Sequence, residues 1–480
     1  MKSKKILSLA VVMLMLASCN GTGGSGDDNG VWWKTTGELT MDANNNIVFD
    51  NVNISLTHVV CGHDQIGFED LIRQFNSEFD GKIRVSTDIY NQLDIDNNVS
   101  RRIQNNDNPP DLVFNHQKSH RNFAINKLIQ PVDECFEYAG ISVEKNDFVE
   151  QFASYCDLGY DNRQRIFDYP VDAQSVVGYY RKDLLDQLGE EVPTSRSEMI
   201  RIAKRAQQEL NMEKPIGITG NSEFTQFYVY TTALAQNGLD FYNSETYYSE
   251  WTEGNNKQAF RDGVHAIYDL TTENLYESGL SEESALNDFC NENKTIFFFG
   301  LPFEANVIFE SFGLSHDGIT NEQVKSDYIG GFSSSKMFAL DETKEYANTI
   351  FGDSHAFMVS KSVEDKTKKA AIATFINWFT SKGKVGADWA ELGHAAGVKT
   401  IINSDEYKNS DFVNNFTNKW YPDMNYFHTP GITPYYSITF AKGIYPCYAR
   451  CFKNAKGVDS KIDENVAAVE RTVNATIRGL

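Results

Sequence analysis

Residues 53–90, NISLTHVVCGHDQIGFEDLIRQFNSEFDGKIRVSTDIY, predict a strand, a helix and a second strand in succession. The stretch 53–61 is largely apolar and β-branched, which is typical of a strand. The segment after it places apolar residues at helical spacing: Phe68, Leu71, Ile72, Phe75 and Phe79. In 82–90, apolar and polar residues alternate with the period of a half-buried strand. This strand–helix–strand unit indicates an α/β architecture.

The same alternation continues along the chain. The breaker NNDNPP precedes a short apolar strand, DLVF (111–114). Ser195 and Glu198 form a capping-box pattern that predicts the start of a helix. Two further predicted strands, IGIT (216–219) and TIFFF (295–299), each precede a predicted helix, and 463–477 reads as a terminal helix. Strands that alternate with helices predict an α/β fold with mainly parallel sheets.

The chain begins with three lysines and a short apolar run that ends in Leu-Ala-Ser-Cys at Cys19. The apolar run is too short to span a bilayer and has the form of an export signal. The sequence before Cys19 resembles the bacterial lipobox, in which this thiol is acylated. We therefore expect a lipoprotein signal peptide over 1–18, with the lipidated Cys19 and a flexible tether over 19–49.

The composition limits the partners. The formal net charge is −22, which opposes binding to nucleic acid, and no second apolar run reaches bilayer length. The remaining cysteines can form disulfides in an exported protein or stay as buried thiols; they are Cys61, Cys135, Cys156, Cys290, Cys447 and Cys451.

Motifs for chemistry are few. Cys447 and Cys451 are spaced for one helix face, but no further zinc ligands stand nearby. DANNNIVFD (42–50) has oxygen ligands at calcium-loop spacing but lacks the glycine turn and the closing glutamate. GTGGSG, in the tether, follows no strand and opens no helix, so it does not indicate a dinucleotide site. We expect no enzyme activity, no cofactor and no metal.

Six landmarks, in order, resemble the extracellular solute-binding proteins of ABC transporters, in the sugar-binding group related to maltose-binding protein. They are FEDLIRQFNSEFDGKIRV (68–85), NNDNPPDLVF (105–114), DYPVDAQSVVGYYRKDLL (168–185), LAQNG (234–238), NKTIFFFGLPFE (293–304) and AAIATFINWFTSKGKVGADWAELGHAAGVKT (370–400). The sequence departs from the family pattern at Phe303, where the family usually has Trp, and in GHAAGV (393–398), which replaces a usual Pro.

The resemblance implies a two-lobed, type II periplasmic-binding-protein-like fold with three hinge crossings and a ligand cleft between the lobes. Lobe 1 is expected over 50–171 and 355–393, and lobe 2 over 176–350 and 399–480. The implied function is a lipid-anchored protein that captures a sugar or oligosaccharide and delivers it to the permease of an ABC importer. It would be a monomer on the outer face of the cell membrane or in the periplasm. Two alternatives remain open: a cell-surface glycoside hydrolase, and a two-lobed sensor subunit.

Sugars present hydroxyl edges to polar side chains and C–H faces to aromatic rings, and the matched positions supply both kinds of group. The candidate ligand-binding residues are His63, Asp64, Asn115, His116, Asp172, Gln174, Tyr228, Phe303, Glu304 and His355, with Ser354 beside the last. Asp172 and Gln174 are two apart in an extended segment, so their side chains are expected on the same side of it.

Overall fold

The computed structural model describes residues 31–60, 63–91, 94–153, 165–220, 223–290, 292–311, 328–428, 433 and 435–479. The predicted signal peptide, Cys19, the tether up to residue 30, Cys61 and Cys156 lie outside this range. Among the helices described, none combines the length and the apolar character that crossing a bilayer requires.

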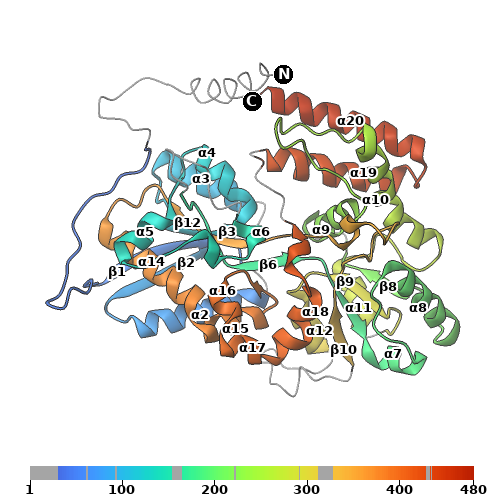
Figure 1. The fold of residues 1–480 in the computed structure, drawn as a ribbon, viewed down its shortest axis with the longest axis horizontal. Helices are drawn as coiled ribbons and strands as arrows, with labels where there is room; N and C mark the ends of the chain where they lie inside the picture. Colours follow the sequence, from blue (N-terminus) through green and yellow to red (C-terminus); the bar gives the residue numbers. More distant parts are fainter. Residues whose placement is uncertain are drawn as a thin grey trace. The chain divides into compact units, whose positions relative to one another are not determined.

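The first sheet has the strand order β2-β1-β3-β12-β4, with β5 paired to β12 (Figure 1). Its strands are β1 Val52–His58, β2 Ile83–Ile89, β3 Leu112–His116, β4 Ile129–Gln130, β5 Tyr169–Pro170 and β12 His355–Ser360. The helices associated with it are α2 His63–Glu78, α3 Ile95–Asn105, α4 His120–Ile125, α5 Val132–Ala139, α6 Glu150–Ala153, α14 Lys366–Ser381, α15 Gly383–Glu391, α16 Lys399–Ile402 and α17 Asp405–Asn409. We call this assembly lobe 1.

The core of lobe 1 follows from the helical spacing seen in the sequence. Phe68 and Phe75 of α2 are fully buried. Phe75 packs edge-on against Phe375 of α14 at a centroid distance of 4.9 Å, and Phe68 stacks on Phe114 of β3 at 5.1 Å. Aromatic contacts of this kind join helices that are 300 residues apart in sequence to one sheet.

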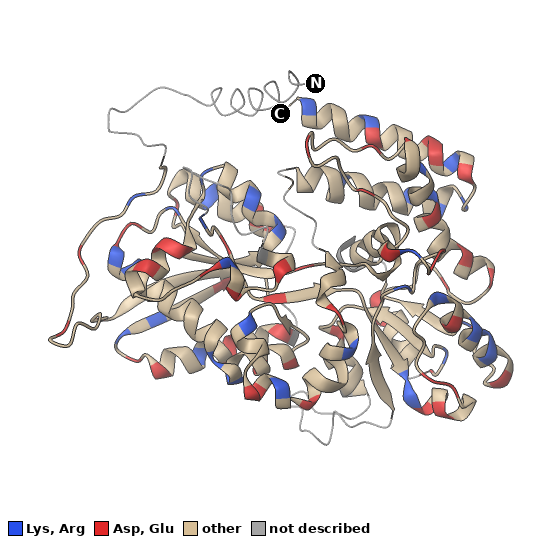
Figure 2. Ribbon diagram, viewed as in Figure 1, with Lys and Arg blue, Asp and Glu red and all other residues tan. Residues whose placement is uncertain are grey.

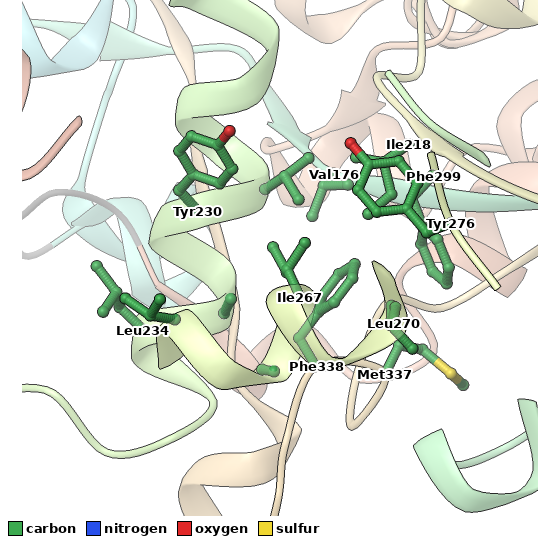
Figure 3. Packing of buried hydrophobic residues seen from close by; sticks show 14 of the residues in the cluster. Val176, Ile218, Tyr230, Leu234, Ile267, Leu270, Tyr276, Phe299, Met337 and Phe338 are labelled. Atoms are coloured by element: carbon green, nitrogen blue, oxygen red, sulfur yellow. The ribbon is translucent and has the colours of Figure 1, made fainter. Parts of the chain in front are cut away.

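The second sheet has the order β10-β7-β9-β8. Its strands are β7 Val177–Arg181, β8 Ile216–Ile218, β9 Phe297–Gly300 and β10 Ile329–Phe332. Around it lie α7 Lys182–Leu188, α8 Arg196–Glu209, α9 Glu223–Ala235, α10 Gly254–Thr272, α11 Glu282–Cys290, α12 Glu304–Ser311, α18 Asn418–Trp420, α19 Tyr445–Asn454 and α20 Asp459–Arg478. We call this assembly lobe 2; Figure 3 shows part of its apolar core, including Phe299, Phe338 and Ile267.

A third, small sheet contains the three segments that the sequence predicted as crossings. Its order is β13-β6-β11-β14, with β6 Asp172–Ser175, β11 Ile350–Asp353, β13 Ala395–Ala396 and β14 Phe427–His428. β6 pairs antiparallel with both β11 and β13. We call this the hinge sheet, because it brings the first, second and third crossings side by side.

The expectation of mainly parallel sheets is wrong. β1 does run parallel to β2 and β3, but β12 runs antiparallel to β3, β4 and β5. In lobe 2, β7 is antiparallel to β9 and β10, and β8 joins β9 in parallel. The reason is the crossings: a strand such as β12, which enters lobe 1 from the hinge sheet, is not constrained by a βαβ connection to run parallel to its neighbours.

Most predicted elements appear at the expected places. β1, α2, β2, β3, β8, β9 and α20 match the predicted strands and helices within a few residues. At the start of α8, the hydroxyl of Ser195 accepts from the Glu198 N–H at 3.4 Å. The Glu198 carboxylate accepts from Thr194 and not from the Ser195 backbone, so the predicted capping box is only half formed. The turn at 42–46 is closed by Asp42, which accepts from the N–H groups of Asn44 and Asn46 at 2.8 Å.

Other helical segments in the described residues are 3₁₀ or π in type. They are Gln117–Ser119, Lys145–Asp147, Glu345–Asn348, Val413–Thr417, Met424–Tyr426 and Ser437–Ile444. Four cysteines in the described residues, Cys135, Cys290, Cys447 and Cys451, are buried free thiols.

The chain before β1 contacts lobe 1. Trp33 and Thr35 donate hydrogen bonds to the Glu134 carboxylate of α5, which also accepts from the fully buried Lys369 of α14. This part of the predicted tether therefore lies against lobe 1.

Candidate ligand site at the hinge

Asp172, at the first crossing, is the centre of a buried polar group that we call the hinge cluster: Asp172, Gln174, His355, Trp389 and His394. Asp172 Oδ1 accepts from the backbone N–H of His355 at 2.7 Å. Its Oδ2 lies 2.9 Å from His355 Nδ1 and 3.3 Å from His394 Nδ1, and it accepts from Trp389 Nε1 at 2.9 Å. One carboxylate thus joins β6 to the start of β12, to α15 and to the chain entering β13.

The charges in this cluster balance one another. Burial alone would raise the pKa of Asp172, but the charges and hydrogen bonds of His355 and His394 outweigh it and hold that pKa well below its usual range. Burial would lower the pKa of His394, but hydrogen bonds to Asp172 and Asp64 raise it to about 9. The Trp389 ring stacks on His394 with centroids 3.9 Å apart. With no metal ion bound, His394 therefore keeps its proton at neutral pH and lies between two carboxylates.

Gln174 lies on the same side of β6 as Asp172, as the two-residue spacing predicted. Its amide end is 2.7 Å from His394 Nδ1 and 3.2 Å from His355 Nδ1. The side chain is almost completely buried. Gln174 therefore contacts histidines of the second and third crossings at once.

Asp64 connects the hinge cluster to both lobes. It lies in the first turn of α2 in lobe 1, and its Oδ2 is 3.2 Å from His394 Nε2. Its Oδ1 accepts from Asn306 Nδ2 of α12, in lobe 2, at 3.5 Å. Beside this contact Gly393, with φ of +99°, approaches the Pro302 carbonyl so closely that a Cβ would lie 2.6 Å from its oxygen. The glycine permits the third crossing to lie against the turn that precedes α12.

Asn306 carries an unusual feature for a buried side chain. Its exposed fraction is 1%, yet its Oδ1 has no hydrogen-bond partner among the described residues. An unsatisfied buried acceptor costs about 1–3 kcal/mol. Its position beside Asp64, where the lobes meet, makes it a candidate for receiving a hydroxyl donor.

A second polar group lies at the second crossing. Asp353, at the end of β11, is 3.4 Å from His116 Nδ1 and 3.6 Å from Lys118 Nζ. Burial would raise the pKa of Asp353, but the hydrogen bond from His116 and the charge of Lys118 lower it. Burial lowers the pKa of His116 to about 4. Lys118 also lies over the ring of Tyr436, 5.2 Å from its centroid, and so links lobe 1 to the C-terminal segment.

Asn115 has a bracing role in lobe 1. It donates to Asp96 of α3 at 2.7 Å, and Asp96 also accepts from Ser119 at 2.9 Å. Ser354 donates its hydroxyl to the His355 carbonyl at the hinge. These two positions order the backbone at the edge of the site.

Glu304 is internal to lobe 2. It accepts from Thr219, the residue after β8, and from the Leu301 N–H, and it is fully buried. Burial raises its pKa to about 8. A Cβ on Gly300 would collide with the Glu304 carboxylate, so the glycine before this turn makes room for it. Glu304 therefore closes the β9–α12 turn.

Phe303, by contrast, is half-buried against the lobe 2 core, in the turn that Gly393 approaches. Tyr228 of α9 is buried. Burial, then the nearby Asp353 carboxylate, raises its pKa well above its usual range. His63 begins α2, and its side chain lies outside the described part of the chain.

The structure brings together Asp64, Asp172, Gln174 and His355, and it places His116 beside Asp353 in a neighbouring group. Several partners were not singled out from the sequence: His394, Trp389, Asn306, Lys118 and Asp353. They come from segments far apart in the chain, so no spacing could reveal them. The one available signal was the histidine in GHAAGV, where the family pattern has a different sequence.

A cavity of about 120 Å³ lies elsewhere, between α10 and α20. Its lining includes Trp251, Phe260, Ile462 and Val466. It shares no residue with the hinge cluster.

Comparison with solved structures identifies the fold. No protein-family model and no curated protein matches the sequence. The GacH receptor of Streptomyces glaucescens, solved unliganded and with acarbose, matches with a TM-score of 0.67 at 14% identity, covering 88% of this chain and 99% of that one.

The maltose/maltodextrin-binding domain MalE of Bdellovibrio bacteriovorus, bound to maltotriose, matches at 0.66 and 14%, covering 89% and 100%. An ABC substrate-binding protein of Listeria monocytogenes, in complex with cycloalternan, matches at 0.64 and 15%, covering 89% and 100%. The chain therefore has the two-lobed α/β fold of the sugar-binding solute-binding proteins of ABC transporters, as the ordered sequence landmarks predicted.

Proposed function

We propose that this protein is a lipid-anchored substrate-binding protein that captures a sugar or oligosaccharide between its lobes and delivers it to the permease of an ABC importer. The observation that carries the proposal is the meeting of polar side chains from both lobes at Asp64 and Asn306, next to the hinge. The fold supports it, since the similar structures hold acarbose, maltotriose and cycloalternan.

The proposed site has separate polar and apolar parts. Asp64 of lobe 1 and Asn306 of lobe 2 would exchange hydrogen bonds with sugar hydroxyls, and Asn306 Oδ1 offers an acceptor with no partner in the described residues. Phe303 would supply an apolar face for the C–H side of a pyranose ring. Tyr228, His116 and Lys118 lie farther along the same junction, beside Asp353.

The hinge cluster would set the equilibrium between open and closed states. Asp172, Gln174 and His355 lie within contact distance of one another and of His394, so we assign them to positioning the crossings and not to direct sugar contact. A ligand that touches both lobes binds the closed state more tightly and shifts the population toward it. The permease would recognise that closed form.

We propose binding without turnover. A glycoside hydrolase requires two carboxylates free to flank one glycosidic bond. Asp64 and Asp172 are instead both paired with His394, and Glu304 is enclosed within lobe 2. Over the described residues, acidic and basic positions are mixed along the helices of both lobes (Figure 2).

A thermal-shift screen over mono- and oligosaccharides tests this function. A ligand that binds only the folded protein raises the melting temperature, by an amount that grows with its concentration. We expect at least one saccharide to raise it and to be recovered without release of new reducing ends. A screen of maltose, malto-, xylo- and cyclic oligosaccharides with no shift would remove the support for a sugar ligand.

The membrane anchor is tested separately. Cys19→Ala should leave the precursor uncleaved or release the protein from the membrane fraction, because the acylated thiol is lost. Ser18→Ala serves as a control that keeps the cysteine and a small residue before it. Mature, membrane-bound protein in Cys19→Ala cells would contradict lipid anchoring.

A further inference from the structure

We propose that the hinge cluster is a zinc site, in which Asp172, His355 and His394 are ligands contributed by the three crossings of the hinge. The three side chains offer Oδ2, Nδ1 and Nδ1, and these atoms lie within 4.8 Å of one another in the buried interior. This proposal concerns a metal ion and not the sugar, and it goes beyond the function proposed above.

The distances fit a tetrahedral ion. Zinc bonds of 2.0–2.1 Å place neighbouring ligand atoms about 3.3 Å apart. Asp172 Oδ2 is 2.9 Å from His355 Nδ1 and 3.3 Å from His394 Nδ1. The amide end of Gln174 is 3.2 and 2.7 Å from the same two nitrogens. Four close contacts therefore link these groups, and the Gln174 carbonyl oxygen could supply a fourth ligand by rotation of the amide.

Hydrogen bonds alone satisfy this arrangement poorly. Each Nδ1 atom faces both Asp172 Oδ2 and the Gln174 amide, although a ring nitrogen carries one proton or one lone pair, not both. Asp172 Oδ2 also receives Trp389 Nε1. A cation at the centre would let both Nδ1 lone pairs and the carboxylate oxygen point inward together.

Residues next to the three proposed ligands could hold them in place by hydrogen bonds, as the outer shell of a zinc site does. A histidine that binds zinc usually donates its other ring N–H to a carboxylate. His394 Nε2 is 3.2 Å from Asp64 Oδ2, and Trp389 Nε1 holds the carboxylate of Asp172 in place. Asp64 and Asp172 together carry the two negative charges that balance a divalent ion in a buried site. Two imidazoles and a carboxylate in tetrahedral geometry favour zinc over calcium or magnesium.

The direct test is metal content of the full chain, purified without a polyhistidine tag. After dialysis against zinc and then against metal-free buffer, plasma mass spectrometry should find about one zinc per protein. His394→Gln and Asp172→Asn should lower the content to background. His265→Gln is the matched control: His265 also lies between two carboxylates, Asp269 and Asp459, but on the surface, and this variant should keep the zinc.

A second readout does not depend on any variant folding. Cobalt(II) added to the metal-free wild-type protein should give the intense visible d–d absorption of a tetrahedral site, and zinc should abolish it. No retained zinc and no cobalt spectrum in the wild type would overturn the proposal. Zinc retained equally by a folded His394→Gln protein would overturn the assigned ligands. Saccharide shifts measured on metal-free protein separate this outcome from failure of the sugar-binding proposal.

Discussion

The lobe 2 core and the hinge cluster are both buried, but the core consists of apolar side chains and the hinge cluster consists mainly of charged and polar ones. In the lobe 2 core, Phe299 packs against Phe332 and Phe338 with centroid distances of 5.4 and 4.9 Å. Figure 3 shows Phe299 and Phe338 among other apolar side chains of this core. In the hinge cluster, Asp172 and His394 are at most 2% exposed and exchange charge-assisted contacts. The lobe 2 core can accept other apolar side chains of similar size, whereas the hinge cluster requires side chains that can pair with each other's charges and hydrogen-bonding groups.

The two regions therefore have different roles in the folded protein. Apolar burial supplies most of the folding free energy and is not directional. Buried ion pairs contribute little net stability but are costly to break, because one partner is left charged in the interior. We infer that the core stabilises lobe 2, and that the hinge cluster fixes how three distant crossings lie together.

The largest expected effect is in the core. Phe299→Ala should lower the free energy of unfolding by about 3–5 kcal/mol, because it removes a ring and leaves a cavity. Urea denaturation measures the loss, and Val458→Ala, at a side chain that is 53% exposed, is the control with an expected change near zero. A loss below about 1 kcal/mol for Phe299→Ala would mean that this core repacks freely.

The second-largest expected loss of stability is in the hinge cluster. Asp172→Asn should cost about 3 kcal/mol of unfolding free energy, because it leaves His394 and His355 without their shared carboxylate. If the two groups act as a pair, the double variant Asp172→Asn/His394→Gln should cost less than the sum of the single variants. Strict additivity in urea denaturation would show that the hinge cluster is not coupled.

Glu304, a buried carboxyl group in lobe 2, should make the unfolding free energy depend on pH. The pKa of Glu304 is raised to about 8 in the folded protein, so the folded state keeps a proton that the unfolded state loses near its ordinary value of 4.5. Stability from this group is present below that ordinary value and declines as pH rises toward the folded value. Between pH 5.5 and 7 the decline should be about 2 kcal/mol.

Glu304→Gln should remove this part of the pH dependence, because the amide cannot ionise and can still accept from the Leu301 N–H. The measurement is the unfolding free energy at both pH values for the two proteins. An unchanged slope in the variant would contradict the assignment of a protonated Glu304.

Sequence reasoning located the elements better than the side-chain partners. The α2 helix and the strands on either side of it follow from local periodicity, and the same holds for the DLVF strand. The directions of the strands did not follow from local periodicity, because β12 enters the lobe 1 sheet from the hinge sheet and not through a local βαβ crossover. The hinge cluster was only half visible: Asp172, Gln174 and His355 were chosen from the landmarks, but His394 and Trp389 join them only through tertiary packing.

Asn306→Ala should have the smallest effect on stability but a clear effect on saccharide binding. Asn306→Ala should leave the melting temperature of the unliganded protein nearly unchanged, since its contact with Asp64 is long, at 3.5 Å. It should weaken saccharide binding by about 1–2 kcal/mol, or roughly 5- to 30-fold, because a ligand hydroxyl loses its acceptor. Asn465→Ala, on the surface of α20, is the control. Loss of stability without loss of affinity would make Asn306 a core residue only.

The most direct test of the account is calorimetric titration of the purified wild-type protein with the saccharide that gives the largest thermal shift. We expect one ligand per chain and a negative heat-capacity change from closure of the lobes over the ligand. We also expect Asp64→Ala and Asn306→Ala, one from each lobe, to weaken binding. Binding that neither variant alters would contradict a site between the lobes, and absence of any saccharide binding would contradict the proposed function.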